Sequence, residues 1–204
     1  MSNRFGPRTR FGGLPFGGRV AQWMPQFSLI KSVQAGAIDL NNATSATATL
    51  SPEVNTANTM LFFLGFSTAL NTGNTPQQGY CALALTNSTT VTASRAANPG
   101  ASAQNVNWAA LEFKAGVIKS IQRGTIVVDT ATSNTAAITA VNTAKSLVQF
   151  LGQVSADTNT GTTGWNPTQF QHTVALTNAT TVTAARVTAG TISYTVSYQV
   201  VEFY

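Results

Sequence analysis

Residues 30–36 read IKSVQAG, and residues 118–124 read IKSIQRG, so one seven-residue phrase occurs twice in the chain. Only two positions differ between the phrases, and the larger change puts Arg123 where the first phrase has Ala35. A phrase of this length that recurs in a chain of 204 residues indicates a repeated structural unit. We therefore expect the fold to be built from two copies of this unit.

The match extends well beyond the opening phrase. NTANTMLFFLGF matches NTAKSLVQFLGQ, LALTNSTTVTASRA matches VALTNATTVTAARV, and NVNWAALEF matches TVSYQVVEF. The offsets between partners drift by only a few residues, as insertions in surface loops would cause. We therefore predict an internal duplication, with one copy over residues 30–113 and a second over residues 118–204. Only the four residues KAGV separate them.

The sequence of each copy favours β-strands. In TISYTVSYQV, the residues Ile192, Tyr194, Val196, Tyr198 and Val200 alternate with polar residues, which is the period of a strand with one buried face. Short apolar runs bounded by glycine, such as SLVQFLGQV, indicate central strands. Copies of roughly 85 residues with five or six short strands are typical of small antiparallel sandwiches. We therefore predict an all-β fold of two tandem small antiparallel β-sandwich domains, preceded by an extended N-terminal arm.

The arm, residues 1–29, differs in kind from the two copies. It contains RFGPRTRFGGLPFGG, in which the many glycines resist regular structure and no neighbouring residues can bury the phenylalanines. We expect the aromatic rings to dock into a partner protein and the arginines to meet its carboxylates. A disordered tail is the alternative interpretation. The residues predicted to anchor the chain are Arg4, Phe5, Arg8, Arg10, Phe11, Phe16 and Arg19.

The chain carries few charges, and its excess of positive charge belongs to the arm. Charged residues make up 8% of the sequence, against about 25% in typical globular domains. Four of the eleven basic residues precede residue 20, so the remainder has seven basic and six acidic residues. Because nucleic-acid-binding domains spread Lys and Arg over a folded face, we do not expect nucleic acid as a partner. A surface of short polar side chains suits contacts with other copies or with a larger assembly.

The sequence lacks the residue sets that catalysis and metal binding require. Cys81 and His172 are its only cysteine and histidine, so neither a zinc tetrad nor an intrachain disulfide can form. We expect Cys81 to be buried and His172 to lie in a loop or at a rim. No nucleophile or phosphate-binding motif is present. We therefore predict a protein that is not an enzyme, with no catalytic residue, no cofactor and no metal.

No apolar run approaches the roughly 18–20 residues of a membrane span, so no membrane insertion is expected.

Two glutamates and two arginines occupy matching positions in the two copies. Glu112 matches Glu202, and Arg95 matches Arg186. Residues that recur in both copies are typical of structural positions, so we expect a Glu–Arg pair within each copy.

Carbohydrate binding is the alternative function that the aromatic residues suggest. Sugars are held by aromatic rings flanked by short polar side chains. Trp108 and Tyr198 fall on the alternating apolar face of a strand, where we expect them to pack in a core. Trp165, in GTTGWNPTQF, and Tyr80 are therefore the candidates for a glycan or partner contact.

IKSIQRGTI, ALTNATTVTAAR and the closing TVSYQVVEF resemble small structural domains in virion proteins of tailed bacteriophages. The closing strand is also similar to that of H-type lectin domains, which are six-stranded sandwiches that assemble as trimers. The resemblance covers most of residues 30–204, and the arm is similar in composition to the anchoring arms of phage appendage and decoration proteins. It implies a virion component, assembled in the bacterial cytoplasm, with lectin-like domains.

The resemblance also implies partners. We expect a homo-oligomer, with a trimer as the expected form, bound to other virion proteins of the tail, neck or capsid. No sugar-contacting motif can be matched residue by residue. A receptor-binding protein that recognises host-surface glycans therefore remains the alternative to a purely structural virion protein.

Overall fold

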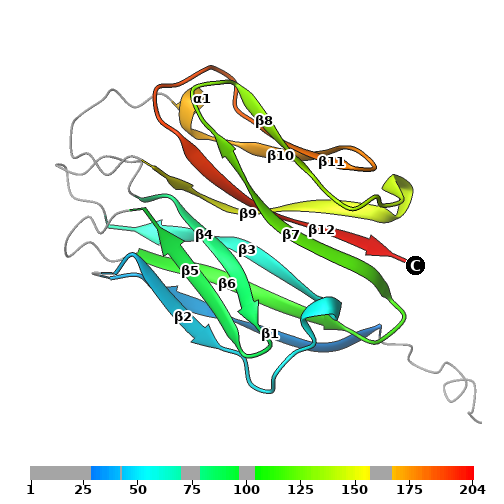
Figure 1. Ribbon diagram of the computed structural model, residues 1–204. Coiled ribbons are helices and arrows are strands. Elements are labelled where there is room, and N and C mark those ends of the chain that lie inside the picture. The colour runs from blue at the N-terminus through cyan, green and yellow to red at the C-terminus, as the bar shows by residue number, and fades with distance from the viewer. Residues whose placement is uncertain (1–28, 42, 70–78, 97–103, 157–166) are drawn as a thin grey trace, which may run out of the picture.

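A computed structural model describes residues 29–41, 43–69, 79–96, 104–156 and 167–204 (Figure 1). Most of the predicted arm, residues 1–28, lies outside the described residues. Most of the described residues lie in strands, and all of the strand pairings are antiparallel. The predicted all-β, antiparallel fold class is therefore confirmed.

The two halves of the described chain contain the same succession of six strands, with a 3-10 turn before the third strand in each half. The first half contains β1 (Ile30–Asp39), β2 (Ser45–Thr49), the 3-10 turn η1 (Thr56–Asn58), β3 (Thr59–Thr68), β4 (Cys81–Asn87), β5 (Thr90–Arg95) and β6 (Gln104–Phe113). The second half contains β7 (Ile118–Val128), β8 (Ser133–Ala137), the 3-10 turn η3 (Thr143–Lys145), β9 (Ser146–Ser155), the short helix α1 (Pro167–Phe170), β10 (Thr173–Asn178), β11 (Thr181–Ala185) and β12 (Tyr194–Phe203).

The strand order is also the same in both halves. One sheet has the order β1-β6-β3, another has the order β10-β11-β8, and a six-stranded sheet has the order β2-β5-β4-β9-β12-β7. The order β1-β6-β3 corresponds to β7-β12-β9, and β2-β5-β4 corresponds to β8-β11-β10. Each half therefore supplies two three-stranded sheets that enclose a core of their own. Figure 1 shows the two halves, called the first and second repeat below, one beneath the other.

A glycine at the end of the duplicated phrase allows a large ring to pack in each core. Trp108 and Tyr198 are each 4% exposed, which confirms that they belong to the cores. The strand register places Gly36 opposite Trp108 and Gly124 opposite Tyr198. A Cβ atom at Gly124 would lie 2.9 Å from Cζ of Tyr198, closer than real Cβ contacts come. Only glycine lets the tyrosine ring lie across the neighbouring strand.

The lysine of the same phrase holds a buried carboxylate in each repeat. Lys31 Nζ lies 2.8 Å from Glu112 Oε1, and Lys119 Nζ lies 2.8 Å from Glu202 Oε1. The carboxylate also accepts a backbone N–H, from Asn55 in the first repeat and Asn142 in the second. The predicted Glu–Arg pairs are therefore wrong, because the carboxylates lie where the phrase begins.

The two arginines lie at the other end of each sandwich and bind backbone carbonyls. Arg95 donates to the carbonyls of Ala43 and Leu40 at 2.8 and 2.6 Å. Arg186 is 5% exposed and holds the loops around it together. It donates to the carbonyls of Ala131, Gln169, Ile192 and Asp129. These arginines hold loops in place and do not form the predicted ion pairs.

The outer face of sheet β7-β12-β9 in the second repeat covers an open edge of the first repeat. Leu151 is 2% exposed and belongs to the core cluster of the first repeat. Next to it, Gly152 pairs with Ala82, and this contact joins β9 to β4. Gln199 is fully buried; it accepts from the N–H of Leu61 at 3.3 Å and donates to the C=O of Leu61 at 2.6 Å. The side chain thus takes the place of a neighbouring strand along the edge of β3.

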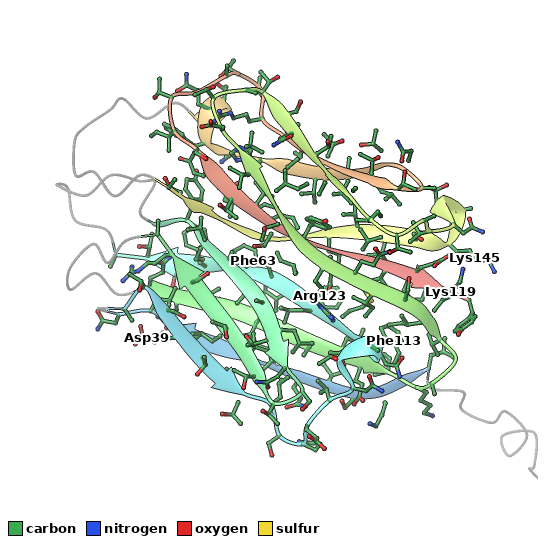
Figure 2. The ribbon with its side chains drawn as sticks, in the orientation of Figure 1. Asp39, Phe63, Phe113, Lys119, Arg123 and Lys145 are labelled. Carbon is green, nitrogen blue, oxygen red and sulfur yellow. The ribbon has the colours of Figure 1, made fainter. Side chains whose placement is uncertain are left out.

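Arg123 reinforces the same contact. Its Nη2 donates to the carbonyl of Thr56 at 3.1 Å and also to that of Thr59. Figure 2 shows this side chain between the two repeats. Burial lowers the pKa of Arg123 from its ordinary value. Arg123 and Gln199 stand where the first repeat has Ala35 and Ala109, so both polar contacts arise from differences between the copies.

Candidate functional site

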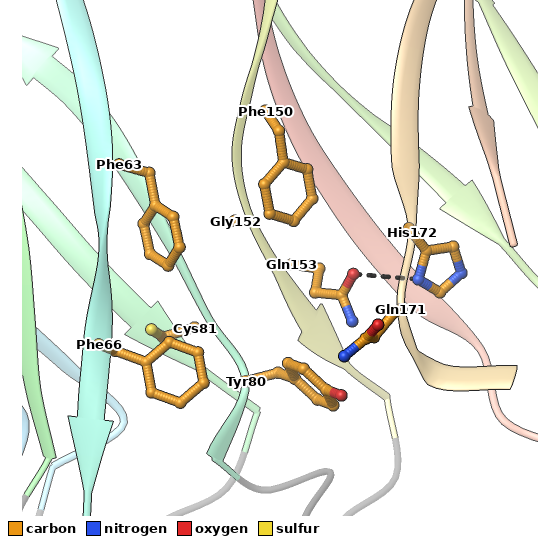
Figure 3. A pocket seen from close by; sticks show the side chains of 9 residues that line it. All are labelled: Phe63, Phe66, Tyr80, Cys81, Phe150, Gly152, Gln153, Gln171 and His172. Carbon is orange, nitrogen blue, oxygen red and sulfur yellow. Dashed lines mark hydrogen bonds between the residues drawn. The ribbon is translucent and has the colours of Figure 1, made fainter. Parts of the chain in front are cut away.

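A pocket of about 250 Å³ lies between the repeats, beside the β4–β9 contact (Figure 3). Its walls come from β3, from the segment that leads into β4, from β9, and from the segment between α1 and β10. The nine residues that line it are Phe63, Phe66, Tyr80, Cys81, Phe150, Gly152, Gln153, Gln171 and His172. The described residues that line the pocket include no Asp, Glu, Lys or Arg. Its chemistry is therefore that of a site for a neutral group.

The pocket is lined by matching positions of the two copies. In the sequence alignment of the two copies, Phe63 matches Phe150 and Phe66 matches Gln153. Just before the next matched segment, Tyr80 matches Gln171. The two copies have diverged, so that the first repeat supplies an apolar wall and the second a mainly polar wall. Figure 3 shows these two walls facing each other. An apolar surface opposite amides is the arrangement that binds a group with one apolar and one polar face.

Aromatic rings fix the apolar wall. Phe63 and Phe150 meet edge to face with their centroids 6.1 Å apart, and Phe66 meets Tyr80 at 6.4 Å. Tyr80 also contacts the buried Tyr194 edge to face at 5.8 Å. Edge-to-face pairs of this kind each add about 0.5–1.5 kcal/mol beyond burial of area. The apolar wall is therefore held in place before any ligand arrives.

A hydrogen-bond chain fixes the polar wall. The amide of Gln153 donates to the carbonyl of Phe170, which leaves Gln153 Oε1 as an acceptor. His172 Nδ1 lies 3.0 Å from this oxygen and therefore carries the ring proton. His172 Nε2 is buried and has no hydrogen-bond partner among the described residues. The second wall thus presents a neutral histidine ordered by a buried amide.

The predicted loop position of His172 is confirmed, but the side chain is buried there. The side chain is only 8% exposed, between α1 and β10, and its ring centroid lies 5.0 Å from that of Tyr194. Burial, and then the nearby charge of Arg186, lowers the pKa of His172 to about 4. The ring is therefore neutral at physiological pH.

This pKa predicts a pH-dependent stability. An unfolded chain protonates His172 near pH 6.5, whereas the folded chain does so only near pH 4. Between these values the unfolded state binds more protons, so the free energy of unfolding should fall as the pH falls from about 6.5 towards about 4. Urea unfolding across this range measures the effect. His172→Gln cannot titrate and should show a smaller slope; an unchanged slope would assign the pH dependence to other groups.

The pocket contains Tyr80, one of the two residues predicted to contact a glycan or partner. Tyr80 lies in the apolar wall, and burial raises the pKa of its hydroxyl. Trp165 and the predicted anchoring residues Arg4, Phe5, Arg8, Arg10, Phe11, Phe16 and Arg19 lie outside the described residues. Sequence reasoning missed the other pocket residues. The sequence feature that could have identified them is the difference between matched positions of the two copies, such as Phe66 and Gln153.

Cys81 lines the pocket but is a buried thiol. It is 1% exposed, as predicted, and burial raises its pKa to about 12. The thiolate needed for nucleophilic attack or metal binding is therefore not formed at neutral pH. Across the described parts of the chain, no three His, Cys, Asp or Glu side chains gather where they could hold a metal ion.

The described residues include no helix with the length and apolar character needed to cross a membrane. The fold and the pocket thus define a tandem β-sandwich protein with a neutral cleft between its repeats. No protein-family model, curated protein or solved structure matches the chain.

Proposed function

We propose that this protein is a non-enzymatic structural component of a bacteriophage virion. Its N-terminal arm holds it on the particle as an oligomeric appendage or decoration of the tail, baseplate, neck or head. The two sandwiches project from the particle as a stiff pair. The proposal joins the sequence resemblance to the way in which the described residues use their charges.

The observation that carries the proposal is that the buried charged groups serve the scaffold. Glu112 and Glu202 are each held by a lysine and a backbone N–H, in two matching sets. Arg95 and Arg186 hold loop carbonyls. Such groups stiffen a fold and are not free to act on a substrate. This use of charge favours a structural role.

The arm supplies the attachment. Burial of Phe5, Phe11 and Phe16 in a partner contributes ~1.5–3 kcal/mol for each ring that is fully buried. The arginines between them orient the arm by bidentate contacts with carboxylates. An oligomer carries several arms, and their combined avidity exceeds that of a single arm through effective concentration.

Deletion of residues 2–19 should yield a folded protein that no longer joins particles. The prediction is tested by supplying either the full-length or the shortened chain to phage that lacks the gene and measuring the chain content of purified particles. The shortened chain should keep the thermal unfolding transition of the full-length protein, because the deleted residues precede the first strand. Normal incorporation of the shortened chain would refute the anchoring role.

The pocket favours a second candidate, a receptor-binding protein that recognises host-surface glycans. Its aromatic wall with Tyr80 faces the amides of Gln153 and Gln171, and a sugar ring also has apolar and hydroxyl-bearing faces. A glycan array decides between the candidates. Glycan binding that Tyr80→Ala or Trp165→Ala abolishes would establish receptor recognition. An array without binding leaves the structural role.

A further inference from the structure

The first repeat exposes an apolar sheet face whose counterpart in the second repeat is covered. This face belongs to β1-β6-β3 and is called the free face below. Val33 is 61% exposed and Leu64 is 59% exposed. Their matching residues lie within the contact between the repeats: Leu151 is 2% exposed in the first core, and Ile121 packs in the cluster around Met60. The same face is therefore an interface in one repeat and open in the other.

The second repeat has the complementary feature. In the first repeat, the edge formed by β3 and β4 is covered, and Leu61 and Leu83 are 0% and 1% exposed. β9 pairs with β4 at Gly152, so the matching edge of the second repeat is formed by β10 and the part of β9 that precedes Gly152. This edge is called the free edge below. It carries Val148 and Val174, which are only half-buried. Leu176 is likewise half-buried, whereas its match in the first repeat is 9% exposed.

The contact inside the chain shows what each free surface accepts. A leucine from the face joins the core cluster at the edge, as Leu151 does with Leu61 and Leu83 in the first repeat. A separate apolar cluster adds to the contact between the repeats, including the edge-to-face pair of Phe113 with Phe203 at 6.1 Å. On the free face, Leu64 stands at the position of Leu151, so it carries the residue that this contact uses.

We propose that the free face of one copy docks against the free edge of a second copy of the same chain. The contact repeats between molecules the arrangement that joins the repeats within a molecule. Because the two surfaces differ, the association is head to tail, which closes into a ring or continues as a filament according to its rotation. The free face has Ala35 and Ala109 in place of Arg123 and Gln199, so this contact is apolar and lacks their hydrogen bonds.

Sedimentation of the purified full-length chain tests the interface. The wild type should sediment as two or more associated chains. Leu64→Glu places a charge at the centre of the free face and should sediment as a single chain at the same concentration. Val187→Glu is the control, because Val187 is 77% exposed and belongs to the segment between β11 and β12, which is part of neither surface. A single-chain wild type, or Leu64→Glu that associates normally, would overturn the proposal.

A mixing experiment tests whether the contact is head to tail. Leu64→Glu keeps its free edge, and Leu176→Glu keeps its free face, so each should be a single chain alone. Their equimolar mixture should contain a species of two chains. Face-to-face pairing predicts instead that Leu176→Glu associates with itself and that the mixture gains nothing, and this result would overturn the proposal.

Hydrogen exchange gives a second reading that does not depend on the folding of Leu176→Glu. On dilution of the wild type into single chains, amides of β1 and of β9 and β10 should lose protection together. Loss of protection on β1 alone would contradict the head-to-tail contact.

The proposal rests on the oligomeric role in the proposed function. Its tests use purified protein without particles, so their failure is distinct from failure of the anchoring arm.

Discussion

Gly152→Ala should lower the free energy of unfolding by roughly 3–5 kcal/mol. Gly152 has φ of +98°, a backbone conformation that side chains rarely adopt, and an added Cβ would lie 2.7 Å from the Cα of Ala82. The substitution therefore strains the backbone and also pushes β9 away from β4, where the repeats join. Urea unfolding of the purified chain, followed by circular dichroism, measures the loss.

Gly65 provides a matched control, because it occupies the same position in the first repeat. Its φ is +102°, but no atom lies within 4 Å of an added Cβ. Gly65→Ala should therefore cost only the backbone strain, roughly 1–2 kcal/mol. The difference between the two variants reports the close approach of the repeats. Equal losses would show that the β4–β9 contact does not depend on the absence of a side chain.

Gln199→Ala should lower the free energy of unfolding by roughly 2–5 kcal/mol, because two buried backbone groups lose their partner. The side chain is fully buried and bonds both the N–H and the C=O of Leu61. Each unpaired group costs about 1–3 kcal/mol, because Leu61 is 0% exposed at the covered edge of β3. Thermal and urea unfolding of the variant measure this cost.

Gln122 makes an equivalent pair of hydrogen bonds to a backbone N–H and C=O at a solvent-exposed position. It donates to the carbonyl of Thr139 at 2.8 Å and accepts from the N–H of Thr139 at 2.7 Å, in an exposed setting. Water can replace these bonds, so Gln122→Ala should cost less than about 1 kcal/mol. A cost for Gln199→Ala no greater than that for Gln122→Ala would contradict a sealed contact between the repeats.

The fold class could be predicted because its signals are local. Alternation with a period of two marks Tyr194, Val196 and Tyr198 as one face of a strand, whatever the strand pairs with. The duplicated phrase adds a second signal, since its last residue, Gly36 or Gly124, is the one that the ring in each core requires. Such features do not depend on how the repeats are placed relative to each other.

The pocket could not be predicted, because it depends on that placement. Phe66, Tyr80 and His172 come together only where β9 meets β4, and no local pattern encodes the meeting point. The positions at which the two copies differ do indicate where the repeats contact each other. Arg123 replaces Ala35 within the opening phrase, and its guanidinium bonds the first repeat.

The wrong Glu–Arg pairs have a related cause. A match between copies shows that Glu112 and Arg95 each have a structural role, but it gives no distance between them. The register places Glu112 beside Ser32, near the start of β1, while Arg95 bonds Gln104 at the opposite end of β6. Partners of buried charges follow from strand register, which alternation alone leaves undetermined.

The composition of purified particles tests the virion assignment most directly. Quantitative mass spectrometry of particles assembled with the full-length gene should find this chain in a fixed ratio to the other structural proteins, and should not find it when residues 2–19 are deleted. Purified particles that lack the full-length chain, while folded protein remains in the lysate, would contradict the assignment.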